Sequence, residues 1–183
     1  DAVDRFLRDW KVRHNTVADG DKAHLVVGDS DWQLPIPVIK TASGWQFDIK
    51  EGAEEILTRE IGRNELAAIE ALHAYVDAQQ SYFALNQKYA QKIVSSAGKK
   101  DGLYWPASPG EAPSPLGPAF SPKEPGTGYH GYRFRILPDK NGFAMVAWPV
   151  SYGQTGVMSF VINQTDKLKQ TDHASDTQNK AQA

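Results

Sequence analysis

Arg133 and Arg135 are the two side chains whose types and spacing most directly predict chemistry. They stand two residues apart in an alternating stretch, so on a strand both project from the face opposite Tyr132 and Phe134. Two neighbouring guanidinium groups can hold a carboxylate, a phosphate or a sulfate through paired hydrogen bonds. The alternative is a solvated sheet face on which the arginines pair with nearby acids, and this commoner arrangement is favoured.

His130 lies just before this stretch, after a loop rich in glycine and proline. A histidine there could act as a general acid or base beside Arg133 and Arg135, which gives a hydrolase-like hypothesis that also needs a nearby carboxylate. A hydrogen-bonded structural histidine is the commoner outcome. The sequence holds no Gly-x-Ser-x-Gly motif and places no serine or aspartate for a triad. Catalysis is left uncertain, the preferred prediction is none, and His130 is the candidate catalytic residue.

The acidic residues and histidines do not form a metal-binding pattern. Asp19 with Asp21 and Asp29 with Asp31 give two acidic turns, whereas calcium takes roughly six to eight oxygens, so turn formation explains them better. The five histidines show no metal-site spacing. With no cysteine, disulfides and thiolate ligands are excluded. No metal and no cofactor is predicted.

Several aromatic residues fall in or beside the predicted loops: Tyr104, Trp105, Tyr129, Trp148 and Tyr152. If several are exposed, they would make a stacking platform for a sugar or a peptide. The preferred alternative is that their rings plug the apolar face of a long helix, because a loop wrapped over a helix needs such plugs. The candidate ligand-binding residues are therefore Tyr104, Trp105, Tyr129, His130, Arg133 and Arg135.

Charge and hydropathy narrow the possible partners. The 183 residues carry a net charge of −2, which gives no electrostatic case for nucleic acid or an anionic membrane. No apolar run approaches the ~20 residues needed to span a bilayer. Because the chain starts at Asp1 and not at Met, we expect a processed form without its signal peptide. The predicted partner is an unidentified envelope protein or polymer.

A long amphipathic helix is predicted over 64–97, because apolar residues recur there at helical spacing. Asn64 is a good N-cap, and Gly98 follows where a C-cap glycine belongs. The apolar stripe weakens at Gln79 and near Asn86, so we expect a bend or break close to Asn86 that gives a long helix and a shorter one. Capping and a salt bridge explain the polar cluster at its start better than acid–base chemistry does: Glu60, Arg63, Asn64 and Glu65.

The predicted fold class is α+β. Residues 1–58 form a small lobe with a helix at 2–14, a strand at 24–28, a proline-bearing edge strand at 32–39, a returning strand at 45–49 and a short helix at 51–57. Residues 59–171 hold the central helix, a wrapped loop over 98–128 with seven of the eleven prolines, and an antiparallel meander with a hairpin turn at Asn141-Gly142. Residues 172–183 are expected to be a disordered polar tail.

Five runs of residues resemble one bacterial family. They are Ile-Gly-Arg-Asn-Glu at 61–65, Tyr-Val-Asp-Ala-Gln at 75–79, Asp-Gly-Leu-Tyr-Trp-Pro at 101–106, Tyr-His-Gly-Tyr-Arg-Phe-Arg-Ile-Leu at 129–137 and Gly-Phe-Ala-Met-Val-Ala-Trp-Pro at 142–149. On these runs the chain is similar, over nearly its whole length before the tail, to the family catalogued as domain of unknown function 2950. The resemblance implies an exported, periplasmic or secreted protein, and it implies no known activity and no catalytic residues.

The chain departs from that family pattern in three places. It is shorter near Asn86 and at 138–142, and it diverges after Leu168, so a function that resides in those segments is in doubt. The central helix followed by the meander is also similar to the globular half of type IV pilin-like proteins, which is a clue to fold only. The sequence thus predicts an uncharacterised exported bacterial envelope protein acting as a non-enzymatic binding module, with the hydrolase-like enzyme as the alternative.

Overall fold

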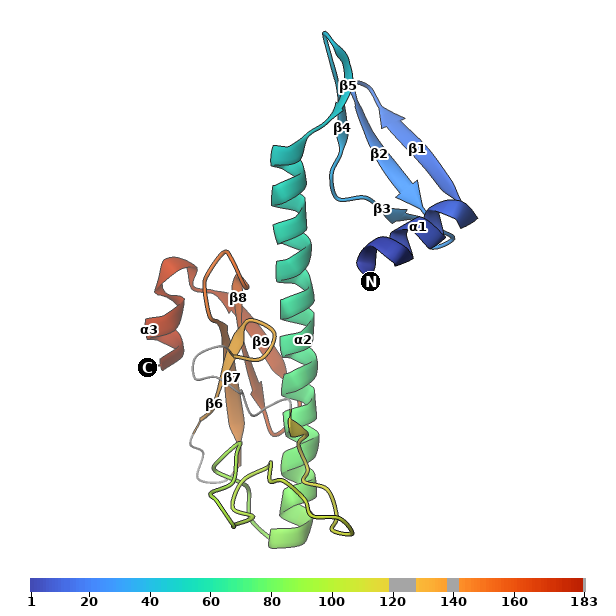
Figure 1. Cartoon of the computed structure of the whole chain (residues 1–183). Helices are drawn as coiled ribbons and strands as arrows, with labels where there is room; N and C mark the ends of the chain where they lie inside the picture. Colours follow the sequence, from blue (N-terminus) through green and yellow to red (C-terminus); the bar gives the residue numbers. More distant parts are fainter. Residues whose placement is uncertain (119–127, 138–141, 183) are drawn as a thin grey trace. The chain divides into compact units, whose positions relative to one another are not determined.

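The computed structural model describes residues 1–118, 128–137 and 142–182 (Figure 1). The chain divides into two compact units, Asp1–Glu60 and Ile61–Ala183. Each unit combines helix with antiparallel sheet, which confirms the predicted α+β class. Within the described ranges, no helix combines the length and the apolar character that crossing a membrane requires.

The first unit is a helix followed by a small antiparallel sheet. It contains α1 (Ala2–Val12), β1 (His14–Asp19), β2 (Lys22–Val27), β3 (Trp32–Gln33), β4 (Val38–Thr41) and β5 (Gly44–Phe47). The strands lie in the order β1-β2-β4-β5, and β3 pairs with the end of β2. α1 begins where the Asp1 carboxylate accepts the backbone N–H groups of Val3 and Asp4, at 2.7 and 3.0 Å.

Two predictions for this unit are wrong in detail. His14 does not end the helix but begins β1, which pairs with β2 along its whole length. The stretch 32–39 is not one edge strand, because Pro35 and Pro37 interrupt it and leave only β3 and the start of β4. The predicted hairpin between β4 and β5 is confirmed.

α2 (Ile49–Asn86) is one continuous helix of 38 residues. It begins early because the Asp48 carboxylate accepts the backbone N–H of Glu51 at 3.0 Å. The separate short helix predicted at 51–57 and the predicted helix start at Asn64 are therefore both wrong. The residues of α2 up to Glu60 belong to the first unit, and the rest belong to the second.

The break predicted near Asn86 is confirmed as the end of α2. Gln87 adopts a left-handed backbone with a φ of 55°, and its N–H donates to the carbonyl of Phe83 at 2.8 Å, which closes the last turn. The shorter helix predicted beyond this point is wrong, since residues 87–97 are irregular and Gly98 caps no helix.

The second unit is built on a four-stranded antiparallel sheet. β6 (Tyr132–Leu137), β7 (Ala144–Pro149), β8 (Met158–Asn163) and β9 (Leu168–Asp172) lie in chain order, which confirms the predicted meander. Alternate strand residues form the core with α2; the most deeply buried are Tyr132, Met145, Ala147, Phe160 and Ile162. We refer to this as the inner face of the sheet. The turn predicted at Asn141-Gly142 falls partly outside the described residues, since Asn141 is not among them.

Polar side chains of α2 fasten this helix to the sheet. The Glu65 carboxylate accepts the backbone N–H groups of Val157 and Met158, at 2.9 and 3.0 Å. The side-chain amide of Asn64 donates to the carbonyl of Thr155 at 3.0 Å. These residues were predicted to cap a helix, and they instead hold the meander against the middle of one.

A long loop leads from α2 towards β6 and packs on the same core. Leu103 and Leu116 are buried, and the Leu116 N–H donates to the Leu103 carbonyl at 3.0 Å. The Asp101 carboxylate ties the loop together, accepting the Ser96 N–H at 2.7 Å and the Lys92 Nζ at 2.8 Å. Residues 119–127 of the predicted loop lie outside the described residues.

The chain is folded up to Gln182, so the predicted disorder is wrong for the described part of 172–183. After β9 come a turn of 3-10 helix, η2 (Ala174–Asp176), and a short helix, α3 (Thr177–Gln182). α3 lies on the side of the sheet away from α2 (Figure 1), where Ala181 packs against Val146 and Trp148. The burial of Ala181 ties the end of the chain to the sheet, which the polar composition of this segment does not predict.

Candidate functional site

The outer face of the second sheet, which points away from α2, carries a pocket of about 440 Å³. Strand alternation builds it: Phe134 and Ile136 pack towards the core, so Arg135 projects to the outer face. The pairing register sets Arg135 opposite Val146, and Val161 opposite Lys169, so one row of pocket residues crosses all four strands. We refer to it as the outer pocket.

Arg135 is one of the charged residues that line the outer pocket. Its Nη2 donates to the carbonyl of Ala181 in α3 at 2.7 Å, which holds the guanidinium in place. Its Nε is buried and has no hydrogen-bond partner within the described part of the chain. A buried donor without a partner costs roughly 1–3 kcal/mol, and because this nitrogen is closed to solvent, a ligand in the pocket would pair with it only after the Arg135 side chain moved.

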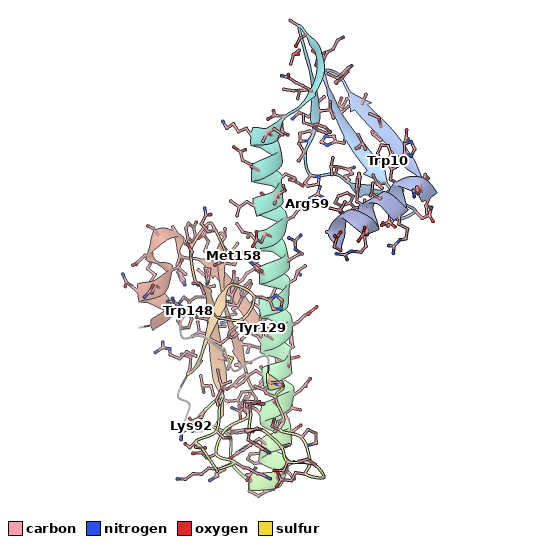
Figure 2. All side chains as sticks on the ribbon, viewed as in Figure 1. Trp10, Arg59, Lys92, Tyr129, Trp148 and Met158 are labelled. Carbon is pink, nitrogen blue, oxygen red and sulfur yellow. The ribbon has the colours of Figure 1, made fainter. Side chains whose placement is uncertain are left out.

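Ser159 and Trp148 add two more unpartnered groups on this face. Ser159 lines the outer pocket, is only 5% exposed, and its hydroxyl has no partner among the described residues. The indole Nε1 of Trp148 is likewise buried and unpartnered there. Figure 2 labels Trp148 on the sheet, and this side chain packs with Val146 and Ala181 on the α3 side.

The rim of the outer pocket is basic. Lys169, His173 and Lys180 line it together with Arg135, and none of its described lining residues is acidic. The nearest carboxylate that pairs with one of these bases is that of Asp176, 3.8 Å from the Lys180 Nζ. An excess of positive charge over a concave surface favours an anion.

The remaining wall of the outer pocket is mostly apolar. Leu137, Val146 and Val161 come from three neighbouring strands, and Ala181 comes from α3. Apolar walls with a few convergent polar groups are typical of small-molecule sites. The arrangement can therefore hold a ligand that has both an anionic and an apolar part.

Arg133 does not join Arg135 in this pocket. The two residues share the outer face, but Arg133 lies one row away, opposite Trp148, and is not among the residues that line the outer pocket. The structure thus separates the two arginines that the spacing grouped together.

His130 is exposed and stands on a turn with a positive φ of 46°. Its ring meets the ring of Tyr129 edge-on, with centroids 4.4 Å apart. Among the described residues, no carboxylate lies within ion-pair distance of it, and no cluster of acids and histidines could hold a metal ion. The partner that a hydrolase-like mechanism needs is therefore not beside His130 in this part of the chain.

The aromatic candidates lie apart from the outer pocket. Trp105 is 8% exposed and belongs to the core, and Tyr104 packs partly buried against that core. Tyr129 is half-buried near β6, with its ring 6.4 Å from that of Phe134. A second pocket, of about 320 Å³, opens beside Trp105, where the Lys100 Nζ sits 5.6 Å from the ring centroid.

Of the ten residues that line the outer pocket, sequence reasoning predicted only Arg135, and among the polar ones it missed were Ser159, Lys169, His173 and Lys180. The first two could have been found, because alternation along β8 and β9 sets them on the same face as Arg135. The last two stand in or beside the segment expected to be disordered, so no pattern indicated their placement.

The first unit has a pocket of a different kind, about 340 Å³ in volume and lined by three glutamates of α2. Two of the three glutamates are paired within the unit: both oxygens of Glu51 accept Lys22 at 2.7 Å, and Glu55 pairs with Arg59 at 2.7 Å. The hydrogen bond to Glu51 raises the pKa of Lys22. Charges already paired in this way leave less for a ligand to satisfy.

These features define an α+β protein of two compact units. The helix α2 contributes residues to both units, and the sheet of the second unit carries a basic pocket. The chain belongs to the family described as protein of unknown function (DUF2950), whose sequence model matches residues 1–142 and 140–183. This match confirms the family resemblance. No curated protein and no solved structure matches the chain, and the similarity to pilin-like proteins stays a prediction.

Proposed function

We propose that this chain is an exported protein of the bacterial envelope, periplasmic or secreted, that binds a ligand without transforming it. The observation that carries the proposal is the outer pocket. It contains buried polar groups without partners in the described residues, and its lining includes basic side chains but no acidic one. Folded proteins satisfy nearly all buried polar groups, so unsatisfied ones that line a pocket are a reason to expect a ligand.

A binding role also fits what surrounds the outer pocket. Its lining residues include a histidine, His173, but no carboxylate that could orient it as a general base, and its hydroxyl and guanidinium are groups that commonly orient anions. The hydrolase-like alternative would need a carboxylate beside His130, and no described contact supports one. The six predicted binding residues contribute Arg135 to the proposed site.

The binding proposal is tested by recovering whatever the protein retains. The protein is incubated with small-molecule extract of the bacterial envelope, washed and denatured, and the released compounds are identified by mass spectrometry. Val161 is 36% exposed and lines the outer pocket, so Val161→Trp should obstruct it without disturbing the core. Leu85→Trp places the same ring on α2 at a residue that is 76% exposed and outside the pocket.

We expect one compound or compound class to be released from the wild type and from Leu85→Trp and to be lost from Val161→Trp. Equal release from all three proteins, or no release from any, would contradict the binding role. Fractionation of cells that make the natural protein tests the location separately: recovery with cytoplasmic markers would contradict export.

A further inference from the structure

We infer that the outer pocket takes a small amphipathic anion, with a single carboxylate or phosphate head held at Arg135 and Ser159 and a short apolar body along the sheet. This inference rests on the proposed binding function and names the class of ligand. It follows from three features of the pocket: which polar atoms lack partners, how the charges balance, and what the rest of the wall is made of.

The unpartnered atoms fix the chemistry of the head group. Arg135 Nε is an N–H donor, and its guanidinium is already held by the 2.7 Å bond from Nη2 to the carbonyl of Ala181. The Ser159 hydroxyl can also donate. A ligand that pairs with these two donors must supply an acceptor, and a charged oxygen is the acceptor that a guanidinium binds most strongly.

The charge balance sets the sign of the ligand. Arg135, Lys169 and Lys180 bring three cationic side chains, and His173 adds a fourth when it is protonated. Against them stands Asp176, outside the lining and 3.8 Å from Lys180 Nζ. Lys169 has no described ion-pair partner. The same excess of positive charge disfavours a cationic ligand, and a neutral ligand would leave the charge of the partly buried Arg135 guanidinium without a counter-charge.

The apolar wall sets the rest of the ligand. Leu137, Val146 and Val161 form a continuous surface over β6, β7 and β8, and Ala181 faces it from α3. A bare inorganic anion would leave this surface in water, whereas an aliphatic or aromatic body would cover it, at about 25 cal/mol per Å² of apolar surface buried. A volume of about 440 Å³ lies within the usual range for small-molecule pockets.

The test is a titration followed by ¹H–¹⁵N spectra, with five probes that differ in one feature each. Octanoate and octyl phosphate carry both parts of the predicted ligand, octanol lacks the charge, octylamine reverses it, and acetate lacks the apolar body. We expect the two amphipathic anions to shift the amide signals of residues 159–161 and 169–171. Their affinity should exceed that of octanol by about tenfold, the worth of one charged hydrogen bond.

Variants distinguish binding through the head group from nonspecific hydrophobic binding. Arg135→Gln should weaken octanoate about tenfold and leave octanol unchanged, because only the charged probe uses the guanidinium. Lys169→Gln should weaken octanoate by a few fold, and this exposed substitution keeps the test available if Arg135→Gln releases α3. Val161→Trp should abolish the shifts, whereas Leu85→Trp should leave them intact.

The inference is overturned if octanol binds as tightly as octanoate, if octylamine binds more tightly, if octanoate still binds Val161→Trp, or if no probe binds. Its failure is distinguishable from failure of the binding function. If the probes fail while envelope extract still yields a compound that Val161→Trp loses, the ligand class is wrong and the binding function stands. If the extract also yields nothing, both fall.

Discussion

The two faces of the C-terminal sheet differ in how far their buried polar groups are paired, although the indole Nε1 of Trp105 in the inner core also lacks a partner among the described residues. On the inner side, the fully buried Gln79 makes three hydrogen bonds: its Nε2 donates to Tyr75 Oη at 3.0 Å and to the Ala90 carbonyl at 2.8 Å, and its Oε1 accepts the Ala90 N–H at 2.9 Å. On the outer side, Ser159 and the Nε of Arg135 are buried with no partner in the described residues.

This difference separates polar groups that stabilise the fold from polar groups that await a ligand. A buried group that is fully paired contributes to stability, and its removal leaves its partners unpaired. A buried group that lacks a partner costs stability in the free protein and repays it only when something binds. The predictions below test that contrast by removing groups from each face.

Gln79→Leu should give the largest effect. The substitution keeps the side-chain volume but leaves the backbone N–H and carbonyl of Ala90 buried without hydrogen-bond partners. We therefore expect the free energy of unfolding to fall by about 3 kcal/mol. The measurement is equilibrium denaturation in urea. The neighbouring Gln80 is exposed, and Gln80→Leu makes the same chemical change at the surface, where it should stay within about 0.5 kcal/mol of wild type. Equal effects of the two substitutions would remove the inner-face half of the comparison.

Glu65→Ala should come next. It removes the acceptor of the Val157 and Met158 N–H groups and should cost about 2 kcal/mol of unfolding free energy. Glu65→Gln keeps an acceptor oxygen at the same place, so it should recover about half of that loss. If Gln recovered nothing, the negative charge and not the two backbone bonds would be what holds the meander to α2.

Alkaline pH offers a smaller test of the inner face. Burial raises the pKa of Tyr75 to about 12, with the hydrogen bond from Gln79 acting in the opposite direction. Because the folded pKa lies above the unfolded value of about 10, the contribution of Tyr75 to stability is present below pH 10 and is lost as pH rises towards 12. Between pH 8 and pH 11, wild type should lose about 1 kcal/mol more than Tyr75→Phe does, measured by urea denaturation at each pH. Parallel losses in both proteins would contradict this assignment.

Sequence patterns predicted the strands and the central helix better than they predicted which polar side chains are buried and paired. Alternation along β6 correctly set Arg135 opposite the aromatic face, and the weakening of the apolar stripe correctly located the break near Asn86, although α2 begins at Ile49 and not at Asn64. Gln79 was interpreted as a weak point of that stripe. In the structure it is buried, because a loop residue eleven positions later, Ala90, returns to meet it. Periodicity describes one helix at a time and carries no information about such a long-range partner.

The candidate site was predictable only in part for a related reason. Local composition made the last residues look disordered, yet tertiary packing of Ala181 on Val146 and Trp148 orders them and brings His173 and Lys180 to the pocket. The prediction that Arg133 and Arg135 share one face of the sheet was correct. The prediction that they act together was not, because residues two apart on a strand are separated by about 7 Å.

Ser159→Ala should give the smallest effect on stability and is the sharpest test of the outer face. Ser159 is as buried as many core residues, at 5% exposure, but its hydroxyl satisfies no partner within the described residues, so its removal should change the unfolding free energy by no more than about 0.5 kcal/mol. The same substitution should weaken octanoate several fold in the titration, because one of the two head-group donors is gone. A loss above about 1.5 kcal/mol, with octanoate affinity unchanged, would mean that the hydroxyl has a structural partner and that the two faces of the sheet follow one rule.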